Sequence, residues 1–236
     1  MTISVSIPAY NEEKYIGECL KSLLANAPAE LLEVIVVDNA STDRTAAVAG
    51  SFAGVRVVKE PQKGLTRARQ RGFVESRGEI LACIDADTRI WEGWFPQIMK
   101  EFQKDPRLVC LSGPFHFYDL PHKQNVLVRF WNWCAAHVSG TFGVVAQGGN
   151  YVIRRSALEQ IGGFDTSIEF YGEDTNIARR LAKVGKVKFT PSFYIYTSAR
   201  RLKSEGIFTV GYKYLANFLS EALLKRQVTK KYRDFR

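Results

Sequence analysis

Apolar and polar positions follow two patterns in the first half of the chain. Short, mainly apolar runs, which are typical of strands buried on both faces, occur at 3–7, 34–37, 55–58 and 80–84. Segments with apolar residues three and four positions apart, the spacing of an amphipathic helix, lie between them at 12–24, 41–49 and 66–76. This alternation predicts an α/β fold in which helices cover both faces of a mainly parallel sheet.

The second half is less regular. We expect a helix at 94–104, a strand at 108–111, a strand at 151–153 and a helix at 173–184. A segment rich in aromatic residues and glycine separates the two strands. We expect this segment, residues 115–150, to line one side of a functional site.

Length and composition fit one soluble domain. The chain has 236 residues and no run of roughly 18 apolar residues. Its start lacks the basic and apolar segments of a secretory signal, so we expect a cytoplasmic protein. The four cysteines are scattered, without the spacing of a zinc site or a disulfide framework, and reduced thiols suit that compartment.

The net charge of +9 is concentrated in part at the end of the chain, where the last eleven residues carry five basic residues and one acid. Nucleic acid, phosphorylated substrates and anionic membranes can each explain a basic protein. No recognised nucleic-acid module accompanies the basic residues, so we expect no nucleic-acid partner.

Polar residues follow three of the predicted strands: 8–12, 38–41 and 85–87. In parallel sheets, ligands bind outside the carboxyl ends of the strands, so we expect these tips to share one functional edge. The pair Asp85 and Asp87 can hold Mg²⁺ or Mn²⁺ together with water and phosphate oxygens. The alternative is a loop whose aspartates bond only backbone amides.

Three further features can serve a site at this edge. Asp38 can accept hydrogen bonds from a nucleoside, or else act locally as a cap. Glu173 and Asp174 begin a helix, where acids either cap amides or keep a carboxylate ionised as a general base. Arg69 and Arg200 can bind a diphosphate, although such residues also occur as solvent-facing charges.

Taken together, five segments resemble the family 2 glycosyltransferases with the GT-A fold. They are Ile7-Pro8-Ala9-Tyr10-Asn11-Glu12-Glu13, Val36-Val37-Asp38-Asn39-Ala40-Ser41-Thr42-Asp43, Lys63-Gly64-Leu65-Thr66-Arg67-Ala68-Arg69, Asp85-Ala86-Asp87 and Gly172-Glu173-Asp174. Each segment is weak evidence by itself, but their order and spacing match jointly over roughly residues 3 to 200.

The resemblance implies a role for each matching residue. The nucleoside would be held by Pro8, Ala9, Tyr10, Glu12 and Asp38, with Arg69 near the nucleotide. Asp85 would contact ribose or metal, and Asp87 would ligate the metal. Asp174 would be the catalytic base, beside Glu173 as the residue that positions the acceptor. Arg200 would reach the diphosphate from a closing loop.

The resemblance therefore implies an inverting, metal-dependent transfer of a sugar from a nucleoside-diphosphate-sugar to an acceptor hydroxyl. The Gln-x-x-Arg-Trp motif of processive synthases is absent after Asp174, which favours single transfers. Residues 1–204 would form the GT-A domain, divided into a nucleotide-sugar half (1–112) and an acceptor half (113–204). The acceptor, a glycan or a lipid-linked molecule, is not identified. No histidine is assigned as a third metal ligand.

Residues 205–236 would form an amphipathic helix and a basic tail. The helix either packs against the domain or lies on the cytoplasmic face of a membrane as a peripheral contact. Two other functions remain as alternatives: a sugar-1-phosphate nucleotidyltransferase, and a non-catalytic nucleotide- or glycan-binding protein. The first lacks its glycine- and arginine-rich loop here, and the second does not account for the joint presence of Asp85, Asp87 and Asp174.

Overall fold

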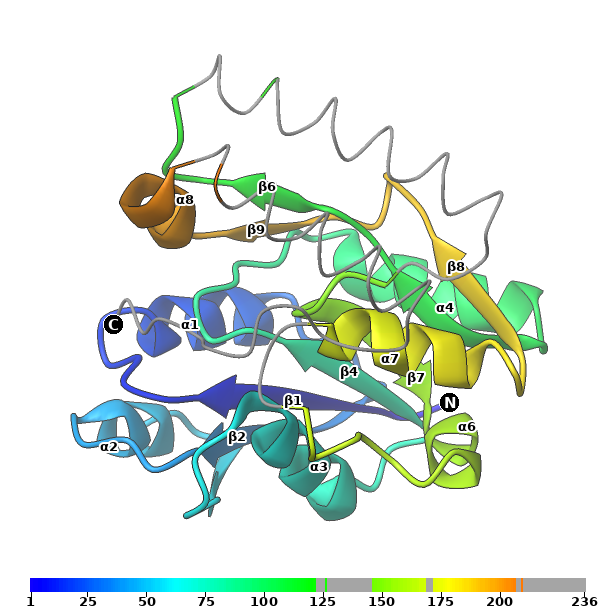
Figure 1. Cartoon of the computed structure of the whole chain (residues 1–236), viewed down its shortest axis with the longest axis horizontal. Helices are drawn as coiled ribbons and strands as arrows, with labels where there is room; N and C mark the ends of the chain where they lie inside the picture. The colour runs from blue at the N-terminus through cyan, green and yellow to red at the C-terminus, as the bar shows by residue number, and fades with distance from the viewer. Residues whose placement is uncertain (122–125, 127–145, 169–171, 207–208, 210–236) are drawn as a thin grey trace.

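The computed structural model describes residues 1–121, 126, 146–168, 172–206 and 209. Its strands are β1 (Ile3–Ala9), β2 (Leu31–Asp38), β3 (Val55–Lys59), β4 (Ile80–Ile84), β5 (Leu108–Ser112), β6 (Phe115–Phe117), β7 (Asn150–Arg154), β8 (Lys186–Phe189) and β9 (Ile195–Thr197). Seven of them form a central sheet in the order β3-β2-β1-β4-β7-β5-β8, while β6 and β9 form a small separate sheet (Figure 1).

Helices cover both faces of the central sheet, as predicted. The helices are α1 (Ile16–Ala25), α2 (Thr45–Gly50), α3 (Leu65–Glu75), α4 (Trp94–Lys104), α6 (Arg155–Gln160), α7 (Glu173–Leu181) and α8 (Arg200–Glu205). One apolar cluster joins the sheet to α1, α2 and α4. Two further clusters join the other face to α3, α6 and α7. The α/β prediction is confirmed.

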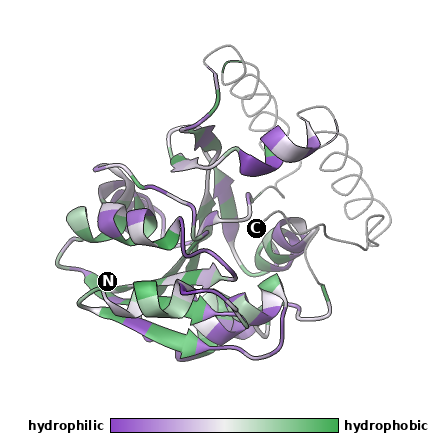
Figure 2. Cartoon of the chain, turned by 90° about the vertical axis from the view of Figure 1, so that its left-hand side faces the viewer, coloured by the Kyte–Doolittle hydropathy of each residue, from purple (hydrophilic) through white to green (hydrophobic). Residues whose placement is uncertain are grey.

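The period of two along each strand explains how one strand supplies both clusters. In β4, Ile80, Ala82 and Ile84 face one layer of helices, and Leu81 and Cys83 face the other. Figure 2 shows hydrophobic residues, in green, along the strands of the sheet. Because both faces are covered, strands such as β2 and β4 have the apolar sequences that made them predictable.

Strand β7 runs against the direction of its neighbours. It pairs antiparallel with both β4 and β5, whereas β1 to β4 pair in parallel, as do β5 and β8. Asn150, the first residue of β7, lies opposite Ile84, the last residue of β4. The segment before β7 therefore reaches the carboxyl end of β4, where the functional residues were predicted.

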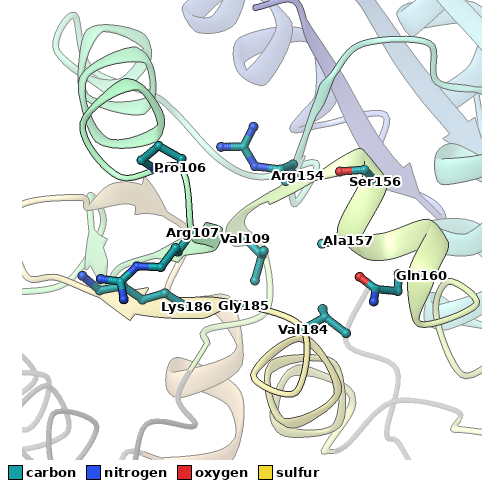
Figure 3. A pocket seen from close by; sticks show the side chains of 10 residues that line it. All are labelled: Pro106, Arg107, Val109, Arg154, Ser156, Ala157, Gln160, Val184, Gly185 and Lys186. Carbon is teal, nitrogen blue, oxygen red and sulfur yellow. The ribbon is translucent and has the colours of Figure 1, made fainter.

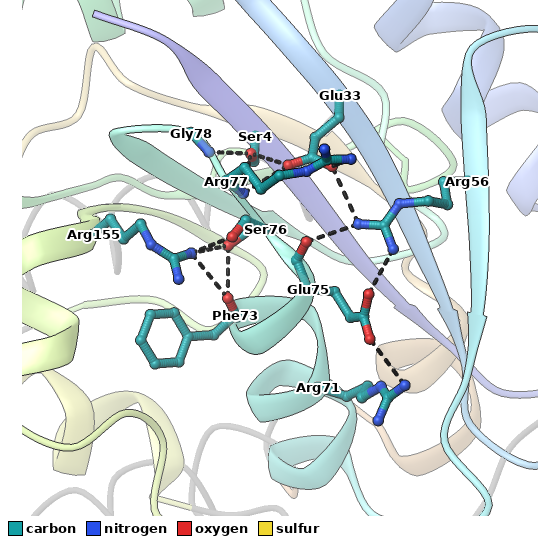
Figure 4. Close-up of polar contacts among 10 residues, drawn as sticks. All are labelled: Ser4, Glu33, Arg56, Arg71, Phe73, Glu75, Ser76, Arg77, Gly78 and Arg155. Atoms are coloured by element: carbon teal, nitrogen blue, oxygen red, sulfur yellow. Dashed lines mark hydrogen bonds and ion pairs between the residues drawn. The ribbon is translucent and has the colours of Figure 1, made fainter.

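Ion pairs and hydrogen bonds connect the elements at the amino ends of the strands, opposite the predicted site (Figure 4). Arg56 binds Glu75 at 2.6 Å and Glu33 at 3.2 Å. Arg155 donates to the Phe73 carbonyl at 3.1 Å and to the Ser76 hydroxyl at 2.8 Å. These contacts fix the end of α3 against the sheet, and so fix the direction in which that helix points toward the site edge.

Several elements differ from the sequence-based expectation. The helix expected at 12–24 begins only at Ile16, because Asn11 has a φ of 52° and residues 12–15 form a turn. The short elements β6, β8, β9, α6 and α8 were not predicted.

Cys19, Cys83 and Cys110 are buried free thiols. Within the residues that the structure describes, no helix has the length and apolar character needed to cross a membrane.

The prediction of an amphipathic C-terminal helix and basic tail falls almost wholly on residues 207–208 and 210–236, which lie outside the described residues. Most of the aromatic and glycine-rich segment, at 122–125 and 127–145, lies outside them as well.

Candidate active site

The ends of β1 and β2 lie side by side. Ala9 pairs in register with Asp38, and both are buried, at 2% and 8% exposure. Pro8 precedes Ala9 in the strand, and Tyr10 follows it with the Lys63 ammonium 3.7 Å above its ring. The residues predicted to hold a nucleoside therefore occupy adjacent strand ends.

The turns beyond these strand ends are bonded to each other. Asn11 accepts from the Thr42 amide at 2.8 Å and donates from its own amide to Ser41 Oγ at 3.1 Å. Asp38 Oδ1 accepts from the Ser41 amide at 3.3 Å, which is the local capping contact considered as the alternative for this residue. Ala40 has a φ of 61°, an uncommon conformation for a residue with a side chain.

Arg69 connects the end of β4 with the start of α7. Its side chain is 1% exposed. It forms an ion pair with Asp85 Oδ1 at 3.2 Å and a second with the carboxylate of Glu173. Tyr151 donates to Glu173 Oε2 at 3.4 Å. Glu173 is itself 6% exposed. The arginine thus lies behind the surface, where it holds two acids from distant parts of the chain.

A second arginine, Arg200, bonds two further acids of the site. Arg200, the first residue of α8, donates to both carboxylate oxygens of Glu12, at 2.6 and 2.7 Å. Its Nη2 lies 3.1 Å from Asp87 Oδ2. Asp87 Oδ1 accepts from the Thr197 hydroxyl at 3.1 Å. Glu12 and Asp87 are therefore joined through one guanidinium.

Two glycines separate Asp85 from Asp174. The Gly148 amide donates to Asp174 Oδ2 at 3.4 Å, and a Cβ on Gly148 would lie 2.6 Å from Glu173 Oε1. A Cβ on Gly149 would lie 2.2 Å from Asp85 Oδ2, and Gly149 has a φ of +82°. Only glycine fits this close approach with that backbone conformation. Asp85, which follows β4, and the start of α7 thus meet at one short backbone segment.

Burial changes the proton affinity of three of the acids. Burial raises the pKa of Asp87 to about 7, although Arg200 lowers it. Burial raises the pKa of Glu173 to about 7, against the lowering effect of Arg69. The pKa of Asp174 is raised by burial and lowered by hydrogen bonds from the amides of Thr175 and Gly148. A raised pKa makes a carboxylate a stronger proton acceptor once it is ionised.

The donor set suits a hard divalent cation that is completed by its substrate. Asp85 has a side chain 38% exposed and so can offer oxygen to a ligand, and Asp87 lies in the same turn, 10% exposed. Among the described residues, no three His, Cys, Asp or Glu side chains form a metal-ligating group. His116 stacks on the ring of Tyr194 at 4.3 Å. Phosphate oxygens and water would have to supply the remaining ligands.

A hollow of about 660 Å³ lies away from these acids (Figure 3). Arg107, Arg154 and Lys186 line it, next to the amino ends of β5 and β8 and the carboxyl end of β7. In an open α/β sheet, ligands bind at the carboxyl ends of the parallel strands, so we assign the chemistry to the acid site and not to this hollow.

Four residues of the site carry no role in the sequence-based prediction: Gly148, Gly149, Tyr151 and Thr197. The pair of glycines before a strand was visible as Gln147-Gly148-Gly149-Asn150. Its place beside Asp85 depends on the antiparallel direction of β7, which has no local signal. Tyr151 and Thr197 have strand positions that look like any other buried residue.

Comparison with known proteins finds a matching family model and related sequences. The family model described as "Glycosyl transferase family 2" matches residues 4–162. A probable glycosyltransferase of Bacillus subtilis, YdaM, is 30% identical over 209 residues, which are 80% of this chain and 49% of YdaM. The chain therefore spans about half the length of this relative.

Two solved structures share the fold. The mannosyltransferase PcManGT from Pyrobaculum calidifontis, in complex with GDP-Man and Mn²⁺, has a TM-score of 0.74 at 21% identity, covering 96% of this chain and 65% of that one. Glucosyl-3-phosphoglycerate synthase from Mycobacterium tuberculosis, with Mn²⁺, UDP-glucose and phosphoglyceric acid, has a TM-score of 0.66 at 22% identity, covering 93% and 79%. The expected GT-A fold is confirmed.

Proposed function

The chain belongs to glycosyl transferase family 2, and we propose that it transfers a sugar from a nucleoside-diphosphate-sugar to an acceptor hydroxyl with inversion, one sugar at a time. The observation that carries the proposal is the approach of Asp85 and Asp174 to the same glycine pair, with Asp87 in the turn of Asp85. The proposed donor site and the proposed proton acceptor therefore lie at the same end of the sheet.

The donor half of the proposal is supported by position. Pro8, Ala9, Tyr10 and Asp38 line the ends of β1 and β2, and Asp85 ends the adjacent strand β4. We assign them to the nucleotide sugar, with Arg200 on the diphosphate. The two structural neighbours contain different donors, GDP-Man and UDP-glucose, so the base and sugar stay open. Arg69 and Glu12, both buried, act by holding Asp85 and Arg200.

We propose Mg²⁺ or Mn²⁺ as cofactor, held by Asp85 and Asp87. Both neighbours bind Mn²⁺ together with a nucleotide sugar. Carboxylate oxygens are the ligands that these ions prefer. When bound, the ion neutralises the charge that develops on the departing diphosphate.

Asp174 is proposed as the general base. The acceptor oxygen forms a bond to the anomeric carbon while the bond from that carbon to the diphosphate breaks on the opposite side, and the acceptor proton passes to Asp174. Amides of Thr175, at 2.8 Å, and of Gly148 orient the carboxylate. Glu173 holds Arg69, and through it Asp85, so it positions the site rather than touching the reacting atoms.

We propose that residues 1–204 form the catalytic domain, with 1–112 binding the donor and 113–204 the acceptor. The acceptor would be a glycan or a lipid-linked molecule, which residues 205–236 would help to reach at the cytoplasmic face of a membrane. Nucleotidyl transfer and binding without catalysis are the rival functions. A test for pyrophosphate release from a nucleoside triphosphate and a sugar-1-phosphate excludes or supports the first.

The test compares the natural chain with Asp174→Asn. Thermal shift with UDP-, GDP- and dTDP-sugars, with and without Mn²⁺, identifies the donor, because a ligand at about 100 to 1,000 times its Kd stabilises by about 3–4 kcal/mol. Asp174→Asn should keep that shift and lose transfer and hydrolysis of the donor. Asp105→Asn, which alters an exposed pair with Lys186, is the control. Undiminished turnover in Asp174→Asn would remove this residue from the mechanism.

A further inference from the structure

Arg200 is held by three side chains of the first half of the chain. Glu12, 3% exposed, accepts hydrogen bonds from both terminal nitrogens of the guanidinium, and Asp87 forms an ion pair with one of them. The ring of Tyr15 lies 4.7 Å from Cζ of the same arginine. A residue at the start of α8 is thus bound directly over the turn that carries the proposed metal ligands.

The carboxylate of Asp87 is engaged on both oxygens by these contacts. Oδ2 faces Arg200 at 3.1 Å, and Oδ1 accepts from Thr197 at 3.1 Å. Asp85 differs, because its side chain is 38% exposed and its bond to Arg69 uses Oδ1. A divalent cation that approaches this turn can reach Asp85, but it must share Asp87 with a guanidinium. Two positive groups on one carboxylate repel each other.

We propose that Arg200 restricts the access of the cation to Asp87 until a nucleoside diphosphate draws the guanidinium away. This inference rests on the proposed function. Planar guanidinium matches phosphate oxygens with two parallel hydrogen bonds, so a diphosphate offers Arg200 a partner equal to the carboxylate. Glu12 accepts from both terminal nitrogens of the same guanidinium and keeps it at the site during the exchange.

Binding of the cation and of the nucleotide then becomes cooperative. A cation alone binds only to the fraction of molecules in which Arg200 has left Asp87, and its apparent affinity is reduced by that fraction. A nucleotide that takes Arg200 removes this reduction, and by linkage the cation strengthens nucleotide binding by the same factor. An arginine that only fastened α8 to the first half would stabilise the fold without coupling the two ligands.

The experiment measures Mn²⁺ binding to the full chain by the EPR signal of free Mn²⁺, which requires no turnover. Each protein is titrated alone and with UDP, GDP or dTDP, against a blank of the same nucleotide without protein, because diphosphates bind Mn²⁺ themselves. We expect the natural chain to bind Mn²⁺ weakly alone and about fivefold or more tightly with one of the three nucleotides. Arg200→Ala should bind Mn²⁺ alone about fivefold or more tightly than the natural chain, and a nucleotide should add little.

Lys203→Ala is the matched control. It removes one positive charge from the same helix together with an ion pair of 2.9 Å, but that pair is with Asp119. It should bind Mn²⁺ as the natural chain does. If Arg200→Ala does not fold, Arg200→Gln replaces it: its neutral amide can still donate to Glu12 but puts no positive charge beside Asp87, so Mn²⁺ alone should bind more tightly here too.

Asp87→Asn separates failure of this inference from failure of the proposed function. If Asp87→Asn loses Mn²⁺ but the folded Arg200 variant binds Mn²⁺ alone no better than the Lys203 variant, the inference is wrong and the metal site stands. If Asp87→Asn binds Mn²⁺ as the natural chain does, or if no protein binds it even with UDP, GDP or dTDP, the proposed metal site is wrong, and the inference with it.

Discussion

The guanidinium of Arg69 is paired inside the protein with the carboxylate of Glu173, a residue 104 positions further along the chain. The same guanidinium reaches Asp85 with its other terminal nitrogen, at 3.2 Å. A single buried side chain therefore sets the position of the donor-side acid relative to the helix that begins with Glu173 and Asp174. This arrangement gives Arg69 a mechanical role that its basic surroundings in the sequence do not suggest.

Arg69→Lys should lose stability and turnover together. Lysine keeps the charge, but its one nitrogen cannot hold two acids on different elements. We expect the free energy of unfolding to fall by about 2 kcal/mol, the scale of one hydrogen bond to a charged group. A shift of the acids should lower turnover by about tenfold or more. Urea denaturation and initial rates measure the two effects.

Arg71→Lys provides the control for this prediction. Arg71 lies on the same helix, 43% exposed, and pairs with Glu75 at 2.9 Å. Exposed pairs of this kind contribute about 0–1 kcal/mol, so the control should behave almost as the natural chain does. Equal losses in both variants would show that Arg69 has no special position.

Glu173→Gln should change how stability depends on pH. Burial raises the pKa of Glu173 in the folded protein to about 7, above its ordinary value of 4.5. Between these values the folded state binds more protons than the unfolded state, so the contribution of Glu173 is fully present below pH 4.5 and is lost as pH rises through 7. Glutamine does not titrate, so in the variant this residue contributes no dependence of the unfolding free energy on pH.

The difference in unfolding free energy between the natural chain and Glu173→Gln should therefore shift in favour of the variant by up to about 3 kcal/mol from pH 5 to pH 8. Denaturant titrations at both pH values measure it. The comparison subtracts other titrating groups, such as Asp87, which are common to both proteins. A difference that is independent of pH, or one that shifts toward the natural chain, would contradict a raised pKa.

How far the sequence predicts this protein depends on which interactions leave a local signal. Strands β1 to β4 are mainly apolar, and the acids at or just after the ends of β2 and β4, Asp38, Asp85 and Asp87, mark the site edge. The family resemblance then supplied Asp174. These features are local, or lie in segments whose order along the chain is itself informative.

The remainder of the site depends on contacts between distant residues. The antiparallel direction of β7 brings Gly149 against Asp85, and nothing in the sequence of residues 150–154 predicts that direction. Arg200 and Arg69 were predicted near the nucleotide, but the sequence gives no sign that each is paired with acids, at Glu12 and Glu173. Short elements such as β6 and β9, three residues each, lack enough periodicity to be predicted.

Asn150→Ala should destabilise the protein by about 3 kcal/mol or more. Asn150 is fully buried at the start of β7. Its amide donates to the carbonyls of Gly113 and Phe193, at 3.1 and 2.8 Å, and its oxygen accepts from Trp94 at 3.3 Å. Alanine leaves these three buried groups without their partner, and each such group costs about 1–3 kcal/mol.

Chemical denaturation checks this value, with Asn26→Ala as the comparison. Asn26 is half-buried and its amide makes one side-chain hydrogen bond, to the Ser22 carbonyl at 2.8 Å, so we expect a loss of about 1 kcal/mol. Similar losses in the two variants would mean that the Asn150 contacts do not anchor the strand.

Gly149→Ala should impair cation and donor binding beyond its effect on the fold. At a φ of +82° an alanine is strained, which costs about 1–2 kcal/mol. Its Cβ would in addition lie 2.2 Å from Asp85 Oδ2, so the carboxylate must move. Since Asp85 is a proposed ligand of the cation and of the donor, we expect Mn²⁺ with a nucleoside diphosphate to bind about tenfold more weakly or worse.

Gly54→Ala separates the effect of backbone strain from the effect of the contact between a Cβ at position 149 and Asp85. Gly54 has a φ of +78° and no heavy atom within 4 Å of a built Cβ, so its variant has the same backbone penalty and an unaltered site. Both variants should lose stability by thermal denaturation, Gly149→Ala at least as much as Gly54→Ala because its Cβ also displaces Asp85, and only Gly149→Ala should lose ligand. If both bind Mn²⁺ and nucleotide equally well, the close approach of Gly149 to Asp85 has no part in building the site, and the geometric basis for placing Asp85 at the donor is weakened.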